Sequence, residues 1–212
     1  MSAIKPISEW RRVMLDTSVL IDFFKDPSRF PKQPLEQRRI ERTHQLLEFL
    51  GSSENEKSRP MTFVVSAITL AELIKLPERG DVLQKIVSTF HTADVLIASF
   101  TPTDGRMVAQ MLETYLQGSQ KFQLLAQLEK DLKTNRVSWA RQWVSDDLKI
   151  VVSAKAQKNL DAVLTADSKT FLTLATAMQL PCVDTNRFPE NLFGEIDTAQ
   201  NFLKPQPGES GQ

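Results

Sequence analysis

The stretch VMLDTSVLID, residues 13–22, decides how the chain folds. Its first three residues are apolar and predict a short buried strand, because a run this brief cannot span a membrane. Asp16 and two hydroxyl residues follow, and an apolar segment typical of a helix begins at Val19. A carboxylate at the end of a buried strand is costly unless something satisfies it. Asp16 is therefore expected to cap the next helix, to bind a cation, or to do both.

The composition is that of a globular protein with one core. A chain of 212 residues, 41% hydrophobic and 25% charged, can bury one good core with an elaboration. Lys+Arg and Asp+Glu are both 26, so the net charge does not indicate a polyanionic partner. Any surface that binds nucleic acid would have to be a local basic patch facing a separate acidic site.

The single cysteine and the absence of long apolar segments bear on location. Cys182 alone excludes an internal disulfide framework and a cysteine-based zinc cluster, and it is typical of a reducing compartment. Residues 1–10 lack the apolar core of a secretory signal. The longest apolar stretch, residues 63–74, is interrupted by polar residues and is too short to cross a bilayer. We therefore expect a cytoplasmic protein without a membrane segment.

Strands and helices are predicted to alternate along the chain. Further strands are expected at Met61–Val65, Val95–Phe100, Ala162–Thr165 and Cys182–Val183. Helices are expected near Val19–Phe24, Leu35–Leu50, Ala67–Leu76, Asp81–Phe90, Gly105–Leu116 with a cap at Thr103-Asp104, Asp147–Asn159 and Ser168–Met178, and an inserted helical segment at about 119–144. This alternation predicts an α/β fold with a central parallel sheet in a single domain, residues 1–188. Residues 189–212 form an extension, which is expected to be flexible at its end.

Four acidic residues occupy similar junctions between strands and helices. They are Asp16, Glu72, Asp147 and Asp167. In a parallel sheet the carboxyl ends of the strands and the first turns of the following helices share one edge, where ligands bind. The sequence therefore predicts that the four carboxyl groups lie at the same edge.

Each of these acids also has a structural explanation. Asp16 and Asp167 could cap helices, Asp147 with its neighbour Asp146 could complement a helix dipole, and Thr69 with Glu72 matches a capping box. These structural explanations account less well for four acids at one edge than for each acid alone, because crowded carboxylates repel one another by roughly 1–4 kcal/mol per close pair. A divalent cation removes that repulsion, and oxygen ligands favour Mg²⁺ or Mn²⁺. The set therefore favours a metal site.

Four motifs in this order resemble those of the PIN domain. They are LDTSVLI at 15–21, SxxTxxEL at 66–73, DxxIxxxA at 147–154 and LTxDxxxF at 164–171. The family comprises metal-dependent ribonucleases and includes the VapC-like toxins of toxin–antitoxin systems. The resemblance covers about Arg12 to Phe188 and implies a three-layer αβα, Rossmann-like domain. The chain is longer than the compact toxins, mainly before the second strand and at 119–144, which leaves the choice of substrate and partner open.

The resemblance also implies roles for individual residues. Asp16, Glu72, Asp147 and Asp167 would be the catalytic acids that hold Mg²⁺ or Mn²⁺, and Thr17 or Ser18, together with Thr165, would be hydroxyls near the metal. Asp146 remains an alternative ligand, although the spacing to Ile150 and Ala154 favours Asp147 as the motif residue. The implied partners are RNA, an antitoxin protein and a second copy of the chain in a homodimer.

The function that the resemblance implies is that of a metal-dependent, toxin-like endoribonuclease. A metal-activated water would attack the scissile phosphate in line and leave 5′-phosphate and 3′-hydroxyl ends. Mechanisms based on imidazole acid–base catalysis are not favoured, because His44 and His91 lie outside every motif.

Basic residues near the acidic edge would have to hold the RNA phosphates. The candidates are Arg38, Arg39 and Arg42 on one helix and Lys155, Lys158 and Lys169 near the other motifs. The alternative for each of them is an ordinary solvated helix surface. In the inserted segment, core packing is expected for Phe122, Leu125, Leu128 and Leu132, with Trp139 and Trp143 buried against them.

Two other functions stay open at this stage. One is a structure-specific DNA nuclease of related fold, and the other is a catalytically silent PIN module that binds RNA or protein. A phosphotransferase of the haloacid-dehalogenase type is excluded, because Ser18 occupies the position at which that family needs a second aspartate.

Overall fold

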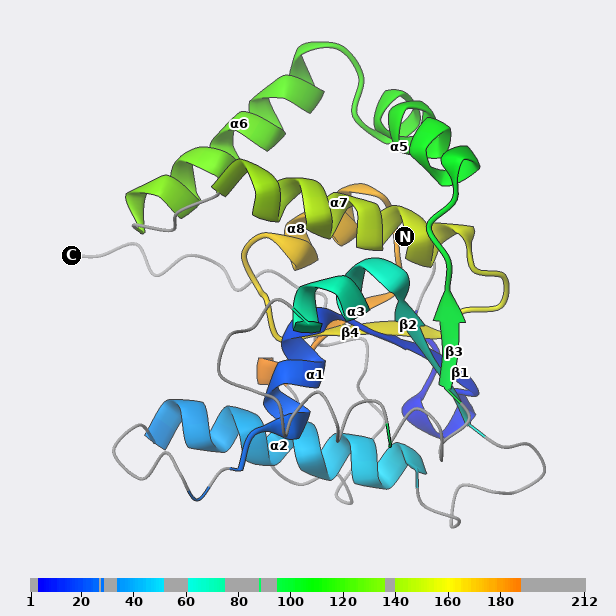
Figure 1. Ribbon diagram of the computed structural model, residues 1–212, viewed down its shortest axis with the longest axis vertical. Coiled ribbons are helices and arrows are strands. Elements are labelled where there is room, and N and C mark those ends of the chain that lie inside the picture. Colours follow the sequence, from blue (N-terminus) through cyan, green and yellow to red (C-terminus); the bar gives the residue numbers. More distant parts are fainter. Residues whose placement is uncertain are drawn as a thin grey trace.

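Five parallel strands form the centre of the computed structural model (Figure 1). The structure describes residues 4–26, 28, 34–51, 61–74, 88, 95–135 and 140–187. The strands are β1 (Arg12–Leu15), β2 (Thr62–Ser66), β3 (Val95–Ala98), β4 (Ala162–Thr165) and β5 (Cys182–Asp184). They lie in the order β3-β2-β1-β4-β5, and every adjacent pair is parallel. The predicted α/β fold with a central parallel sheet is confirmed.

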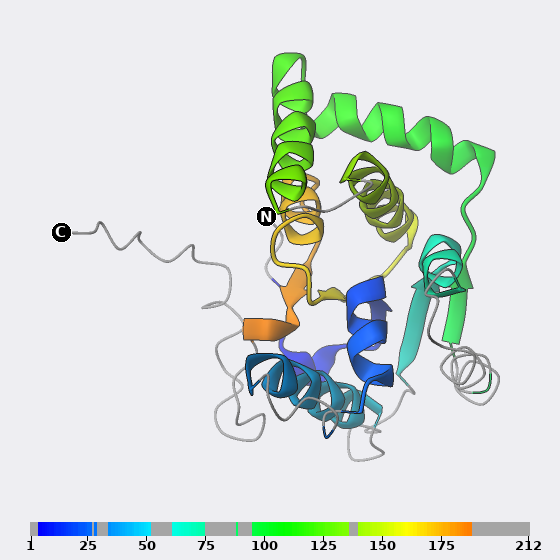
Figure 2. The ribbon, with the colours of Figure 1, turned by 60° about the vertical axis from the view of Figure 1, so that its left-hand side comes forward.

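Helices cover both faces of this sheet, which gives the three layers of a Rossmann-like fold (Figures 1 and 2). The helical elements are η1 (Ile7–Glu9), α1 (Thr17–Phe24), α2 (Pro34–Gly51), α3 (Ala67–Ile74), α5 (Pro102–Tyr115), α6 (Ser119–Thr134), α7 (Ala140–Ala156), α8 (Phe171–Ala177) and η4 (Thr185–Arg187). Helix α2 packs on α1, whereas α7 packs on α8 and is covered on its outer side by α5 and α6. None of the helices in the described part of the chain combines the length and apolarity that crossing a bilayer requires.

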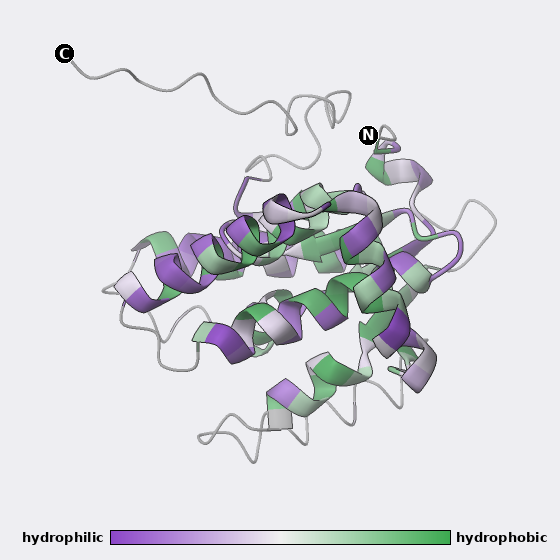
Figure 3. Cartoon of the chain, turned by 90° about the horizontal axis from the view of Figure 1, so that it is seen from above, coloured by the Kyte–Doolittle hydropathy of each residue, from purple (hydrophilic) through white to green (hydrophobic). Residues whose placement is uncertain are grey.

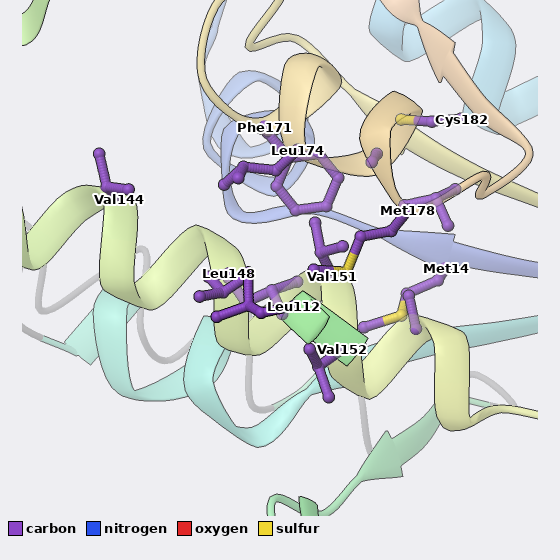
Figure 4. Close-up of a cluster of buried hydrophobic side chains, with 14 of the residues drawn as sticks. Met14, Leu112, Val144, Leu148, Val151, Val152, Phe171, Leu174, Met178 and Cys182 are labelled. Carbon is purple, nitrogen blue, oxygen red and sulfur yellow. The ribbon is translucent and has the colours of Figure 1, made fainter. Parts of the chain in front are cut away.

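The strand residues divide between two hydrophobic clusters. Met14, Val64 and Val163 belong to the cluster with α7 and α8, part of which is shown in Figure 4. Val13 and Leu15 belong to the cluster on the opposite face, with α1 and α2. In Figure 3 the helices mix hydrophobic and hydrophilic residues along their length, as expected of helices with one face on a core. Side chains alternate along a strand, so this division also fixes which way the residues at the strand ends point.

The ends of the strands are level with one another at the carboxyl edge. Leu15 of β1 is in register with Val65 of β2 and with Leu164 of β4. The residue that follows each of these three strand positions therefore lies at the carboxyl edge. Its side chain is on the face of the sheet covered by α7 and α8, the same face as Met14 and Val163. These next residues are Asp16, Ser66 and Thr165.

Three boundaries differ from the predictions. Helix α7 begins at Ala140, not at Asp147, because no proline or glycine interrupts residues 140–147 and the buried stripe of Val144, Leu148 and Val151 continues through them. Asp147 thus lies about two turns inside the helix, and the inserted segment ends in the first turns of α7 rather than as a separate element. Helix α5 is capped by Thr101, with Asp104 completing a capping box, instead of by Thr103-Asp104.

Two predictions fall on residues outside the described part of the chain. The helix expected at 81–90 lies there except for Ser88, and so does the C-terminal extension at 189–212. The other predicted helices and strands agree with the structure to within about three residues at each end that the structure describes.

Candidate functional site

Asp16 is the buried centre of the carboxyl edge. Its side chain is only 2% exposed and caps α1. Three donors meet at Oδ2: the Ser18 N–H at 3.4 Å, the Ser18 hydroxyl at 2.6 Å and the Thr165 hydroxyl at 2.9 Å. Burial raises the pKa of Asp16, and the charge of Asp167 raises it further, against the effect of these hydrogen bonds. Asp16 is therefore a cap, as one alternative predicted, and the hydrogen bonds from Ser18 and Thr165 all fall on its Oδ2.

The hydroxyl groups tie the loop after β1 to the loop after β4. Ser18 Oγ accepts the Ala166 N–H at 2.8 Å, and Thr165 Oγ1 accepts the Asp167 N–H at 3.0 Å. Asp167 in turn accepts the N–H groups of Lys169 and Thr170 at Oδ1, both at 2.9 Å. Asp167 thus orders the turn that leads into α8, but it does not cap that helix as predicted, because the N-cap is Thr170 and no side chain caps it.

Glu72 reaches the same edge from α3. It accepts a hydrogen bond from the Thr17 hydroxyl, which joins the first turn of α1 to α3. The predicted capping box of Thr69 and Glu72 is wrong. Helix α3 begins at Ala67, where Ser66 Oγ accepts the Ile68 N–H at 3.1 Å, and the Thr69 hydroxyl is buried without a partner. Glu72 is therefore turned toward Thr17 and not toward the start of its own helix.

The neighbours Asp146 and Asp147 differ in their surroundings. Asp146 accepts hydrogen bonds from Gln142 Nε2, 2.8 Å from each carboxylate oxygen, and from Lys149 Nζ at 2.7 Å. Asp147 makes no hydrogen bond or ion pair within the described part of the chain. Burial raises its pKa well above the usual range, and the charges of Asp16, Asp167 and Glu72 raise it further.

The raised pKa of Asp147 indicates that the four predicted acids lie near the same edge of the sheet. Each comes from a different part of the chain, namely the ends of β1 and β4 and the helices α3 and α7. Each of the other three carboxylates acts on Asp147 strongly enough to disfavour its charged form. The contacts also distinguish Asp147 from Asp146, because Asp146 already has a cationic partner in Lys149.

The four carboxylates do not form a ready-made metal cage. Among the described residues, no three His, Cys, Asp or Glu side chains are grouped closely enough to hold an ion. Like charges repel, so separation is the expected arrangement of these acids. Mg²⁺ commonly keeps several water ligands and takes only one or two carboxylates directly, and it prefers oxygen donors. Asp147, which has no hydrogen-bond partner in the described part of the chain, and the carboxylate oxygens of Asp16 and Asp167 fit that requirement.

The predicted RNA-binding residues lie in different places. Arg39 holds the buried Asp22 with two hydrogen bonds, at 2.7 and 2.9 Å, and Arg42 donates to the Asn186 carbonyl at 2.8 Å. Arg38 is exposed on α2, and Lys169 is exposed two residues after Asp167. The structure thus gives Arg39 a structural partner and leaves Arg38 and Lys169 open to solvent.

Lys155 and Lys158 are not brought to the acidic edge. Helix α7 ends at Ala156, and the chain then enters β4 at its amino end. Lys155 is about 12 Å along the helix from Asp147 in that direction, and its Nζ lies 4.9 Å from the centre of the Tyr115 ring. The histidine His44 is likewise structural, with Nε2 at 3.1 Å from the Lys25 carbonyl, whereas His91 lies outside the described residues.

Two residues near this edge were not predicted from the sequence. The Asn186 side chain donates to the Ala166 carbonyl and to Asp184, both at 2.8 Å, and so joins the loops after β4 and β5. Its only sequence signal is a polar residue directly after the last strand. Trp143 of α7 is 53% exposed, so its predicted burial is wrong, and Trp139 lies outside the described residues. Core packing is likewise wrong for Phe122, which is 69% exposed, whereas Leu125, Leu128 and Leu132 do pack against the core.

The site occupies the topological switch point of the sheet. Strand β1 lies between β2 and β4, so the chain crosses to one side after β1 and to the other side after β3. The crevice at such a point is where open parallel sheets bind ligands. Fold and site together define an α/β protein with a cluster of carboxylates and hydroxyls at its switch point. Comparisons of the chain with models of protein families, with curated proteins and with solved structures found no match.

Proposed function

We propose that this protein is a divalent-metal-dependent endoribonuclease of the PIN type, acting in the cytoplasm. The observation that carries the proposal is the environment of Asp147, a half-buried acid whose pKa is raised by burial and by the charges of three further carboxylates, and which has no cationic partner in the described part of the chain. Acids used only for structure are normally paired with cations or backbone donors. The order of the four motifs along the sequence supports a PIN domain over other nucleases with acidic sites.

In this proposal, Asp16, Glu72, Asp147 and Asp167 would hold one or two Mg²⁺ or Mn²⁺ ions. A bound ion supplies Lewis acidity toward the phosphate and lowers the pKa of an attacking water. The chain's own hydroxyl groups keep the acids in place. Ser18 and Thr165 donate to Oδ2 of Asp16, and Thr17 orients Glu72.

The hydrogen bonds of the hydroxyl groups also explain why Asp16 can be charged in a buried position. Two hydroxyl groups and one N–H donate to a single oxygen, and such donors favour the ionised form. Burial opposes ionisation and prevails, so the pKa of Asp16 is raised. A bound cation would offset that penalty. In this proposal, a divalent ion would complete the electrostatic balance of the site.

The resemblance to PIN toxins extends the proposal to partners. We propose a toxin-like protein that is held in check by an antitoxin and that assembles as a homodimer. Sedimentation velocity on the purified chain tests the dimer, with a monomer at micromolar concentration as the contradicting result. A small protein that co-purifies with the chain and blocks its cleavage of RNA would support the antitoxin.

Cleavage with a matched pair of variants tests the nuclease itself. Wild type, Asp16→Asn and Asp146→Asn are incubated with Mn²⁺ and a structured RNA, and in parallel with single-stranded and flapped DNA. We expect wild type and Asp146→Asn to cut RNA and Asp16→Asn to be inactive, because the Asn keeps the shape and removes the charge. Cleavage of the flapped DNA alone would indicate a structure-specific DNA nuclease. Equal binding of RNA by all three without cleavage would indicate a silent binding module.

A further inference from the structure

Trp143 is a large aromatic side chain left in solvent beside the acidic site. It is 53% exposed, and no hydrogen bond, ion pair or ring contact joins it to another residue in the part of the chain that the structure describes. Tryptophan is highly buried on average, because its large apolar ring gains much from leaving water. Its exposure on a helix would therefore be explained by a ligand that covers the ring.

The helix geometry places Trp143 on the side of Asp147. The two residues are four positions apart on α7, so they share a face and are separated by about 6 Å along the axis. Val144 and Leu148, labelled in Figure 4, mark the buried side of the same turns. Asp147 in turn responds to the charges of Asp16, Asp167 and Glu72. Trp143 thus stands one turn outward from the carboxylate cluster.

The other large hydrophobic residues that are exposed in the described ranges lie on different elements. Leu35 is on α2, Leu96 and Ile97 are on β3, and Phe122 is on α6, none of which supplies an acid of the site. Next to Trp143 in the sequence, Arg141 and Gln142 are exposed and polar. A surface that docks a protein normally presents a contiguous apolar patch, and the described residues of α7 present only this one exposed large ring.

A nucleic-acid base fits this position better than a phosphate does. Phosphates are repelled by carboxylates, whereas a base is uncharged and offers a flat π-surface to a tryptophan ring. Single-stranded RNA is recognised by stacking its unpaired bases on aromatic side chains, and bases within a duplex are already stacked on one another. The ring is therefore suited to an unpaired nucleotide near the acids.

We propose that Trp143 stacks on an unpaired base of the RNA next to the scissile phosphate, and so selects single-stranded segments. The proposal rests on the proposed nuclease function and names its substrate class. It makes Trp143 a binding residue that lies outside the group of acids.

Direct binding measurements test the stacking. Wild-type Trp143, Trp143→Ala, Trp143→Phe and Phe122→Ala are prepared in an Asp16→Asn background, so that RNA is bound and not cut. Fluorescence anisotropy then gives the Kd for a labelled 12-nucleotide single strand and for the duplex of the same sequence. Phe122 is the matched control, since it is 69% exposed and lies on α6.

We expect Trp143→Ala to weaken binding of the single strand by about 5- to 100-fold. Trp143→Phe should retain most of the affinity, Phe122→Ala should change nothing, and none of the variants should alter duplex binding. The tryptophan fluorescence of the parent protein should be quenched by the single strand, and this quenching should be lost in Trp143→Phe. Trp143→Ala should melt at the temperature of the parent, because an exposed ring contributes little to the core.

Several results would overturn the proposal. They are equal affinity of Trp143→Ala and the parent, an equal loss in Phe122→Ala, or a change in sedimentation of Trp143→Ala with RNA binding unaltered, which would assign the ring to a protein surface. The nuclease can fail separately. If the wild-type protein binds single-stranded RNA through Trp143 but never cuts it, the nuclease proposal is wrong and the stacking proposal is retained. If the wild-type protein cuts RNA and Trp143→Ala leaves the Kd unchanged, only the stacking proposal is wrong.

Discussion

The two edges of the sheet treat their aspartates in opposite ways. At the amino edge, Asp161 accepts the N–H groups of Arg11 and Arg12 at 2.8 and 3.0 Å and binds Lys5 Nζ at 2.6 Å. Burial acts to raise the pKa of Asp161, but these donors outweigh it and the pKa is lowered. At the carboxyl edge, burial and neighbouring carboxylates raise the pKa of Asp147.

In the proposed function, the difference would separate an acid used for structure from acids that hold a metal ion. Asp161 joins the N-terminal segment to the start of β4, and its charge is matched by a cation within the chain. Asp16, Asp147 and Asp167 have hydroxyl and backbone donors or none, and each adds to the negative charge at their edge. An arrangement that costs folding energy is retained where function requires it.

The largest effect on stability is expected at the amino edge. Asp161→Ala removes the carboxylate that accepts hydrogen bonds from Lys5 and from the N–H groups of Arg11 and Arg12. Because the two N–H groups then lack a partner, the free energy of unfolding should fall by about 2–3 kcal/mol. Urea unfolding measures the change. Asp131→Ala serves as control, because Asp131 is exposed on α6 and is expected to change stability by less than about 0.5 kcal/mol. A similar stability of the two variants would remove the contrast between the edges.

A smaller effect of the opposite sign is expected at the carboxyl edge. In metal-free protein at pH 7.5, Asp147→Asn should raise the free energy of unfolding by about 1 kcal/mol, because it removes a repelled charge. Thermal melts with EDTA measure it, beside Asp146→Asn. Asp146 is paired with Lys149, so that variant should be less stable than wild type or equal to it. Destabilisation by Asp147→Asn would mean that its charge is satisfied within the chain.

The pH dependence of Asp147 follows from the sign of its pKa shift. Because the pKa is raised in the folded protein, folded Asp147 holds its proton more tightly than the unfolded chain does. Its contribution to stability is present below the unfolded pKa of about 3.9 and is lost as the pH rises through the folded value. Metal-free wild type should therefore lose stability relative to Asp147→Asn as the pH rises from 4 to 8. Parallel profiles would contradict the shift.

The smallest effect on stability is expected from the hydroxyl that orients Glu72. Thr17→Val removes the hydrogen bond to Glu72 and should lower the free energy of unfolding by about 0.5–1 kcal/mol. Outer partners of metal ligands have a larger effect on affinity, so Mn²⁺ binding should weaken about tenfold. Thr114→Val is the control, since the Thr114 hydroxyl donates only to a carbonyl of its own helix and should leave Mn²⁺ binding unchanged. Equal effects of both variants on Mn²⁺ binding would contradict the role of Thr17.

The sequence was sufficient to predict the sheet and the location of the acids. Short apolar runs that end in acidic or hydroxyl residues, such as those before Asp16 and Asp167, predict both a strand and the position of its carboxyl end. Register then follows from the parallel topology, so Thr165 and Asp16 come together without any contact being visible in the sequence. The capping role of Asp16 was also predictable, because caps depend on local chain order, whereas α8 begins three residues later than predicted and Asp167 does not cap it.

Features that depend on packing between distant segments were not predictable. Trp143 has the helical spacing of a core residue, and only the position of α7 against α6 and α8 leaves it in solvent. Lys155 follows the third motif closely in sequence, yet the direction of α7 carries it toward the amino edge. Asn186 depends on two loops meeting across β4 and β5. Helix direction and loop contacts arise from the tertiary structure, which composition and periodicity do not specify.

The central claim is that the carboxyl edge binds a divalent ion through Asp147 and not through Asp146. Isothermal titration of Mn²⁺ into wild type, Asp147→Asn and Asp146→Asn at pH 7.5 tests it most directly. We predict saturable binding in wild type, similar binding in Asp146→Asn, and loss of the tightest site in Asp147→Asn. Absence of binding in wild type, or equal binding in all three proteins, would contradict a metal centre at this edge of the sheet.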